Sequence, residues 1–223
     1  MLSRRPPDLL IFDCDGVLVD SEMIASETLA AHLKDHGVEI SAAQCRRRFT
    51  GYSLDKMVTE ITAEGARLPG DFLPTLRQRD IVAFARDLQP LPGIVSFLKG
   101  SDVPRCVASS GITEKIRTNL QTTGLLAFFD DAVFSADMVT HAKPAPDLFL
   151  LAARDMGADP RGCLVIEDSA LGVAAATAAG MRVFGFSGGS HCGSGYSEML
   201  RGAGAPIVFS HMTDLADLID GAF

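Results

Sequence analysis

The sequence lacks paired cysteines, an excess of positive charge and any long apolar run. Its five cysteines, 14, 45, 106, 163 and 192, are scattered without zinc-type or redox-type spacing, which indicates reduced, mostly structural thiols. Acidic residues outnumber basic ones by 28 to 20, which disfavours nucleic acid and anionic membranes as partners. No segment reaches the roughly 18 apolar residues of a membrane span. We expect a soluble cytoplasmic protein, a monomer or weak homo-oligomer.

Short apolar runs and helical patterns are abundant. The 223 residues are 47% hydrophobic, which is enough for a substantial core. Strand-like runs without alternation are separated in most cases by helical patterns, and they occur at 9–12, 106–108, 132–134, 163–166, 183–186 and 207–209. This order predicts a doubly wound, Rossmann-like α/β core with a parallel sheet. Such sheets bind ligands beyond the carboxyl ends of their strands.

The segment from about residue 21 to 89 contains no convincing strand. Its pattern predicts helices, and Ser41 with Gln44 forms a capping box at the start of one of them. The segment ends at a Pro-rich boundary over 89–93. We therefore predict an α/β core over 1–18 and 91–223, interrupted by an all-helical cap over 19–90. The insertion either covers the carboxyl ends of the strands as a lid or only adds stability.

Two aspartates, Asp13 and Asp15, follow the run at 9–12. Side chains alternate along a strand, so we expect Asp13 and Asp15 to point the same way. Two like charges in one site need a cation, or one of them must hold a proton. One carboxylate could then attack an electrophile while its neighbour carries a proton. An Asp-x-Asp-Gly string also occurs in plain turns, so the pair alone is a weak signal.

Further polar residues follow other predicted strands: Ser109 with Ser110, Lys143, and Glu167 with Asp168. Each could instead have a purely structural role, as a helix cap or a solvated loop residue. Their joint occurrence at one edge of one sheet favours a site. Carboxylates are the hard oxygen ligands that Mg²⁺ prefers, and lysine and serine can bind phosphoryl oxygens. Together these residues predict phosphoryl transfer with a phosphate ester as the small-molecule partner.

At these residues the chain resembles the haloacid dehalogenase (HAD) superfamily, in its phosphatase and phosphomutase branch with a helical cap. The shared motifs are Asp-Cys-Asp-Gly-Val at 13–17, Ser109, Lys-Pro at 143–144 and Glu-Asp-Ser-Ala-Leu-Gly at 167–172. The resemblance implies that Asp13 is the nucleophile that forms an aspartyl-phosphate and that Asp15 is the general acid and base. It also implies that Asp13, the Asp15 backbone carbonyl and Asp168 hold Mg²⁺, with Glu167 a ligand or a partner of the ligands.

Several alternatives stay open. A dehalogenase attacks carbon without a metal and lacks the second aspartate, so Asp15 argues against it. A β-phosphoglucomutase-like enzyme has a histidine and an arginine in its cap, where this chain has Ala25 and Leu54. Losing both favours simple hydrolysis of a small phosphorylated metabolite. A phospho-acceptor receiver module is the alternative that is not an enzyme.

The cap region is similar, more weakly, to those of bacterial sugar-phosphate and 6-phosphogluconate phosphatases. This likeness rests on the Val-Asp-Ser-Glu string at 19–22 and on segment 48–51. Arg46, Arg47, Arg48 and Lys56 are possible contacts for a sugar or sugar-acid leaving group, with Arg48 and Lys56 as the specificity residues that we predict. A run of charges is more often a solvated helix face.

Overall fold

The computed structural model describes residues 6–49 and 54–222. The chain divides into two compact units, a core unit (Met1–Asp20 with Gln89–Phe223) and a helical unit (Ser21–Leu88). Each junction differs by two residues from the boundary expected from the sequence. Among the described residues, no helix is long and apolar enough to cross a bilayer.

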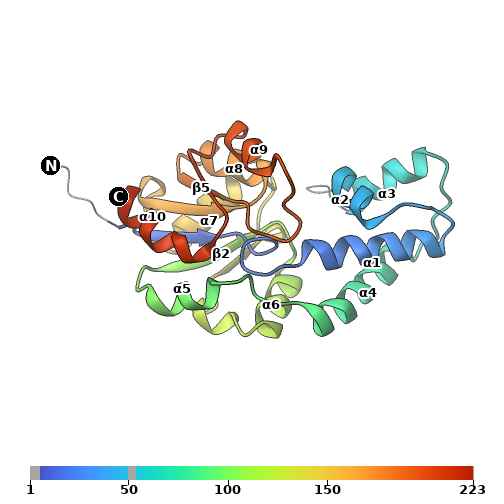
Figure 1. Ribbon diagram of the computed structural model, residues 1–223, viewed down its shortest axis with the longest axis horizontal. Coiled ribbons are helices and arrows are strands. Elements are labelled where there is room, and N and C mark those ends of the chain that lie inside the picture. The colour runs from blue at the N-terminus through green and yellow to red at the C-terminus, as the bar shows by residue number, and fades with distance from the viewer. Residues whose placement is uncertain (1–5, 50–53, 223) are drawn as a thin grey trace. The chain divides into compact units, whose positions relative to one another are not determined.

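A six-stranded sheet in the order β3-β2-β1-β4-β5-β6 forms the centre of the core unit, and every neighbouring pair is parallel (Figure 1). Its strands are β1 (Leu9–Phe12), β2 (Arg105–Ser109), β3 (Val133–Ser135), β4 (Cys163–Glu167), β5 (Arg182–Phe186) and β6 (Ile207–Phe209). The predicted α/β class with a parallel sheet is confirmed. All four residues of β1 are buried, because both faces of the sheet are covered.

Helices pack on both faces of this sheet (Figure 1). The α-helices of the core unit are α5 (Ile94–Gly100), α6 (Thr113–Thr122), α7 (Asp147–Asp155), α8 (Ala170–Ala178), α9 (Tyr196–Gly202) and α10 (Leu215–Ala222). Its short 3₁₀ turns are η1 (Leu126–Phe128), η2 (Ala136–Met138), η3 (Pro160–Gly162) and η4 (Met212–Asp214).

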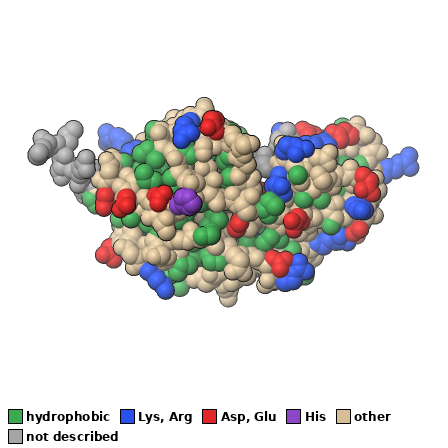
Figure 2. Space-filling view, viewed as in Figure 1, with side chains coloured by type: hydrophobic (Ala, Val, Ile, Leu, Met, Phe, Trp, Pro, Cys, Tyr) green, Lys and Arg blue, Asp and Glu red, His purple; other side chains and the backbone are tan. Residues whose placement is uncertain are grey.

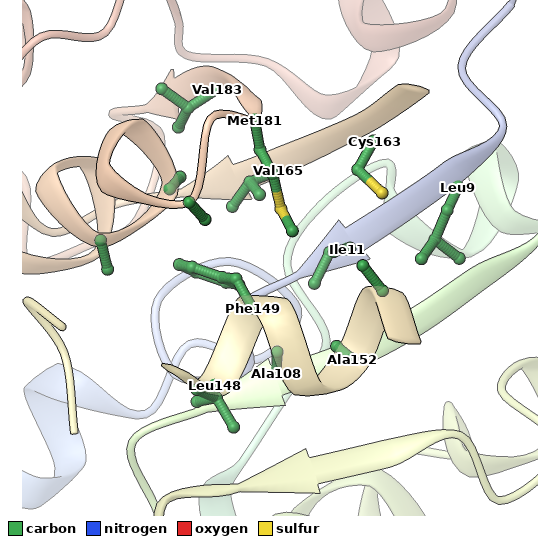
Figure 3. Close-up of a cluster of buried hydrophobic side chains, with 14 of the residues drawn as sticks. Leu9, Ile11, Ala108, Leu148, Phe149, Ala152, Cys163, Val165, Met181 and Val183 are labelled. Atoms are coloured by element: carbon green, nitrogen blue, oxygen red, sulfur yellow. The ribbon is translucent and has the colours of Figure 1, made fainter. Parts of the chain in front are cut away.

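The two faces take alternate residues of β1. Leu9 and Ile11 pack with α7 and α8 side chains such as Phe149 in one cluster (Figure 3). Phe12 points to the opposite face, where its ring meets Phe97 of α5 edge-on at 6.1 Å between centroids. Burying a side chain of this size stabilises the fold by about 1.5–3 kcal/mol.

The helical unit contains α1 (Glu22–Asp35), α2 (Ala42–Phe49), α3 (Leu54–Ala63) and α4 (Phe72–Asp87), with no strand among its described residues. Its own apolar cluster includes Leu33, Cys45, Ile61 and Leu76. The predicted capping box before α2 is confirmed: Gln44 N donates to Ser41 Oγ at 3.3 Å, and Ser41 N donates to Gln44 Oε1 at 2.9 Å.

Candidate active site

The strand register brings three predicted residues to one edge of the sheet. Phe12 pairs with Val107 on one side and with Ile166 on the other. Asp13 follows Phe12 directly, so it lies beside the ends of both neighbouring strands. Its backbone N donates to Ile166 O at 3.0 Å. Asp13 thus lies between the end of β2, which holds Ser109, and the end of β4, which holds Glu167. Ser109 is buried, and Ser110 is exposed at the start of the following loop.

Lys143 connects these strand ends. Its Nζ donates to Asp13 Oδ1 at 2.9 Å, to Glu167 Oε1 at 2.6 Å and to Ala108 O at 3.0 Å. Only 3% of its side chain is exposed, and Nζ lies 4.7 Å from the centre of the Phe149 ring. A buried ammonium needs all three of its donors paired, and this one has three acceptors. The lysine is therefore a fixed part of the site.

Both carboxylate oxygens of Glu167 are occupied by the protein. Oε1 accepts from Lys143, and Oε2 accepts from Ser169 N at 2.8 Å and from Ser169 Oγ at 2.9 Å. Ser169 Oγ also accepts from Gly172 N at 3.0 Å, which makes Ser169 the N-cap of α8. A Cβ atom at Gly172 would lie 1.7 Å from Glu167 Oε1, so only glycine leaves room for this carboxylate.

Three carboxylates form a compact buried cluster. Asp13, Glu167 and Asp168 each offer an oxygen, and these oxygens all lie within 4.8 Å of one another. Burial raises the pKa of Asp13 to about 8; Lys143 opposes this rise, while Glu167 and Asp168 add to it. Burial alone would lower the pKa of Lys143, but Asp13 and Glu167 outweigh burial and raise it.

The charge of this cluster fits a divalent cation. Lys143 contacts two of the carboxylates, and His191 Nε2 lies 3.0 Å from Asp168 Oδ2. When all three carboxylates are ionised, they outnumber the two basic side chains, so the cluster is net negative even with both basic side chains protonated. Buried charge must be compensated, and a hard cation with oxygen ligands does so. Asp13 and Asp168 are the better placed ligands, because Glu167 already has both oxygens bonded.

Asp15 has partners of its own on α6. Its Oδ2 accepts from Lys115 Nζ at 2.8 Å, and its Oδ1 accepts from Asn119 Nδ2 at 3.4 Å. Strand β1 ends at Phe12, so the alternation that we expected to carry through Asp13 and Asp15 stops before them. The two carboxylates contact different lysines. Asp15 is thereby held apart from the Lys143 contacts of Asp13.

The predicted specificity residues belong to the helical unit. Arg48 forms an ion pair with Glu64, and its guanidinium lies 4.8 Å from the centre of the Phe49 ring. Arg46 donates to Ser26 Oγ at 3.1 Å, and Lys56 lies exposed on α3. On the face seen in Figure 2, acidic and basic side chains are interspersed over this unit. Residues 50–53, which include the end of segment 48–51 and precede Leu54, lie outside the described residues.

Sequence reasoning missed three partners of the predicted residues: Lys115, Asn119 and His191. Lys115 and Asn119 are spaced i, i+4 on α6, which would have placed them on one face of the helix that follows β2. The sequence around His191 contains no spacing that indicates Asp168 as its partner. No local pattern indicates which carboxylate a lysine or histidine will meet.

Comparisons with known proteins match most of the chain. The model of the haloacid dehalogenase-like hydrolase family matches residues 7–180. A 6-phosphogluconate phosphatase of Escherichia coli is 28% identical over 186 residues, covering 82% of this chain and 84% of the relative. A fructose-1-phosphate phosphatase of the same organism is 33% identical over 184 residues, covering 77% and 92%.

Solved structures share the whole fold. A haloacid dehalogenase-like protein of unknown function from Agrobacterium tumefaciens superposes with a TM-score of 0.87 at 35% identity, covering 96% of this chain and 98% of that one. The likeness extends over both compact units, since it covers nearly all of each chain.

Proposed function

The chain belongs to the haloacid dehalogenase-like hydrolases and is a phosphatase of that family, and from this premise we propose its substrate class, cofactor and catalytic residues. The substrate is a small phosphorylated metabolite, a sugar phosphate or a sugar-acid phosphate. The reaction is hydrolysis of the phosphate monoester through an aspartyl-phosphate, with Mg²⁺ as cofactor. The observation that supports this proposal is Lys143, buried between Asp13 and Glu167 at the carboxyl edge of the sheet.

Asp13 is the nucleophile in this proposal. Its carboxylate attacks phosphorus, the bond from phosphorus to the ester oxygen breaks, and the leaving alcohol takes a proton. A water then attacks phosphorus, the bond to Asp13 breaks, and inorganic phosphate leaves. Lys143 holds Asp13 Oδ1, which fixes the direction of the carboxylate before the substrate arrives.

Asp15 is the general acid and base. It gives its proton to the leaving oxygen in the first step and takes a proton from the attacking water in the second. Lys115 and Asn119 hold its carboxylate away from the Lys143 contacts. The two aspartates can therefore have separate roles although only one residue lies between them.

Ser109, Ser110 and Lys143 bind the phosphoryl oxygens in this proposal, and Glu167 positions Lys143. The three donors of Lys143 are paired within the protein, so Lys143 would exchange one acceptor for a phosphoryl oxygen. Asp13, Asp168 and the Asp15 backbone carbonyl would hold Mg²⁺. When bound there, the ion supplies positive charge that removes the repulsion between the Asp13 carboxylate and a phosphate dianion. The five cysteines are free thiols, which supports our proposal of a cytoplasmic location.

The substrate class follows the relatives named above, which are phosphatases of 6-phosphogluconate and fructose 1-phosphate. We propose that Lys56 and Arg48 contribute to specificity. Arg48 would have to exchange Glu64 for a group on the substrate, whereas Lys56 is exposed on α3. Ala25 lies on α1 and supplies no histidine, which supports hydrolysis over phosphomutase chemistry.

The test is release of inorganic phosphate from p-nitrophenyl phosphate, fructose 1-phosphate and 6-phosphogluconate, with Mg²⁺ or with a chelator. We expect Mg²⁺-dependent release by the wild type and none by Asp13→Asn. Near-normal release by Asp13→Asn would overturn the mechanism. A stable phospho-aspartate without turnover would indicate a receiver module, and conversion of β-glucose 1-phosphate to glucose 6-phosphate would indicate a mutase.

A further inference from the structure

Asp168 has a buried partner that the proposed mechanism leaves without a task. His191 lies in the segment 187–195, between β5 and α9, and its Nε2 is 3.0 Å from Asp168 Oδ2. The two side chains are only 3% and 7% exposed. A histidine and a carboxylate this well buried form a specific contact, because solvent cannot replace either partner.

Two glycines make the space for this pair. A Cβ atom at Gly16 would lie 2.0 Å from Asp168 Oδ2 and 2.9 Å from His191 Cε1. A Cβ atom at Gly189 would lie 2.5 Å from His191 Cε1 and 2.6 Å from its Nδ1. Backbone from two distant parts of the chain therefore approaches the contact from two sides, and any side chain at either glycine would displace it.

The segment that carries His191 is anchored beside it. Ser190 donates to Asp20 Oδ1 from its backbone N at 3.2 Å and from its Oγ at 2.7 Å. The Tyr196 ring meets the imidazole edge-on at 5.2 Å between centroids, and its hydroxyl oxygen lies 3.1 Å from Nε2. These contacts fix both the backbone and the ring, so the direction of the Nε2 proton is set before any ligand binds.

The ring nitrogens have unequal surroundings. Nε2 has Asp168 Oδ2 at 3.0 Å, the Tyr196 hydroxyl at 3.1 Å and Cys192 Sγ at 3.4 Å. Nδ1 is buried and has no hydrogen-bond partner within the described parts of the chain. An acceptor carboxylate beside Nε2 places a proton on that nitrogen, which then donates to Oδ2.

We propose that His191 is a positioning residue for the metal: by holding Asp168 Oδ2, it fixes the direction in which the Asp168 carboxylate faces Mg²⁺. This inference rests on the proposed function, because it assumes that Asp168 is a metal ligand. Hydrogen bonds to ligating side chains orient the ligands of many metal sites, and removing one typically costs about 10- to 100-fold in metal affinity or activity. The alternative is that the imidazole only fills space beneath the segment 187–195.

Matched substitutions separate the two roles. In His191→Gln the amide nitrogen reaches close to the position of Nε2, whereas in His191→Asn it reaches only the position of Nδ1. His191→Phe keeps a ring without a donor. Mg²⁺ binding to the full chain is measured by titration calorimetry without substrate, and thermal unfolding without Mg²⁺ checks that each variant is folded.

We expect Asn and Phe at this position to weaken Mg²⁺ binding by about 10- to 100-fold, and Gln to stay close to the wild type. Equal Mg²⁺ affinity in wild type and a folded His191→Asn overturns the inference, whatever the phosphatase activity. A wild type that releases phosphate but binds no Mg²⁺ overturns the inference and the proposed cofactor, and leaves the phosphatase assignment standing.

A measurement on the wild-type protein tests the inference even if the variants fail to fold. The ¹⁵N resonance of His191 Nε2 is followed while Mg²⁺ is added without substrate. We expect this resonance to shift together with metal binding, because ligation of Asp168 weakens its acceptance from Nε2. If calorimetry shows that Mg²⁺ binds and the Nε2 resonance does not move, the inference is overturned.

Discussion

Lys143 is the residue on which the charge balance of the site depends. It is the shared partner of Asp13 and Glu167, and all three side chains are at most 10% exposed. Removing one member of such a group leaves the others charged and without a partner in a medium of low polarity. The site can therefore be tested through stability as well as through activity.

We predict that Lys143→Met lowers the free energy of unfolding by about 3–5 kcal/mol above about pH 8, where Asp13 and Glu167 are both ionised and lose their cation. The loss should shrink as the pH falls toward 8. The folded pKa of Asp13 is about 8 in the wild type, and loss of the lysine raises it further, so the variant takes up the Asp13 proton at a higher pH than the wild type does.

The measurement is urea unfolding in chelator at two pH values. Lys115→Met is the control, because its ion pair with Asp15 is half exposed, with 39% of the lysine accessible, and should change stability by about 1 kcal/mol or less. Equal losses in the two variants would contradict the role of Lys143.

His32 in the helical unit gives the opposite pH dependence. It is fully buried, and its Nε2 lies 3.0 Å from Phe72 O. Burial lowers its pKa below the ordinary 6.5. The unfolded chain then binds more protons than the folded one, so stability is lost as the pH falls below about 6.5, by at most about 1.4 kcal/mol per pH unit.

We predict that His32→Gln, whose amide can still donate to Phe72 O, shows a flatter loss of stability between pH 7 and pH 5. The measurement is the urea midpoint of unfolding for wild type and variant at several pH values. Parallel curves would rule out His32 as the titrating group.

At the scale of elements, the start of α8 couples local helix chemistry to the site. Ser169 caps the helix and also holds Glu167, and Gly172 in the first turn leaves the space that this carboxylate fills. Glycine inside a helix normally costs about 0.5–1 kcal/mol relative to alanine. Here the helix bears that cost because a side chain at this position would exclude Glu167.

We predict that Gly172→Ala lowers the rate of phosphate release by about 100-fold or more, because displacing Glu167 also displaces Lys143. Gly202→Ala is the matched control: this glycine ends α9, and a Cβ there would meet nothing within 4 Å. It should keep full activity and gain up to about 1 kcal/mol of stability. Normal activity in Gly172→Ala would show that the site adapts.

Helices and strands could be predicted where the sequence pattern that specifies them is local. All six strands lie where apolar runs occur. Helices α2 and α8 begin directly after their capping residues, Ser41 and Ser169. Boundaries moved by a residue or so where hydrogen bonds to a neighbouring strand extend the pairing, as at Arg105 and Glu167. The predicted run at 9–12 matches β1, but the sequence did not show that the alternation of side chains stops before Asp13 and Asp15, where the backbone turns to make the loop of Gly16.

At the scale of the whole molecule, the chain leaves and re-enters the core unit at one place. Asp20 N donates to Gln89 O at 3.0 Å, and Leu91 N donates to Leu18 O at 2.9 Å. The two connections to the helical unit therefore run side by side. All the described side chains of the carboxylate cluster and of Lys143 belong to the core unit.

We predict that the core unit folds when residues 21–88 are replaced by a short Gly-Ser linker, because the linker has only to join adjacent ends. Urea should unfold it in one cooperative transition, with a smaller dependence on denaturant than the full chain shows, since less surface becomes exposed. The absence of a cooperative transition would show that the core unit needs the helical unit to fold.

The sequence by itself determined the α/β class, the positions of the strands and the presence of Asp13, Ser109 and Glu167 at strand ends, because these follow from local apolar patterns and from the geometry of parallel sheets. The tertiary structure decided which charged groups meet. Lys143 reaches Asp13 and Glu167, Lys115 reaches Asp15, and His191 reaches Asp168. A long basic side chain can reach several carboxylates, and only the packing of the strands and loops that carry it leaves one arrangement in which every buried charge is paired.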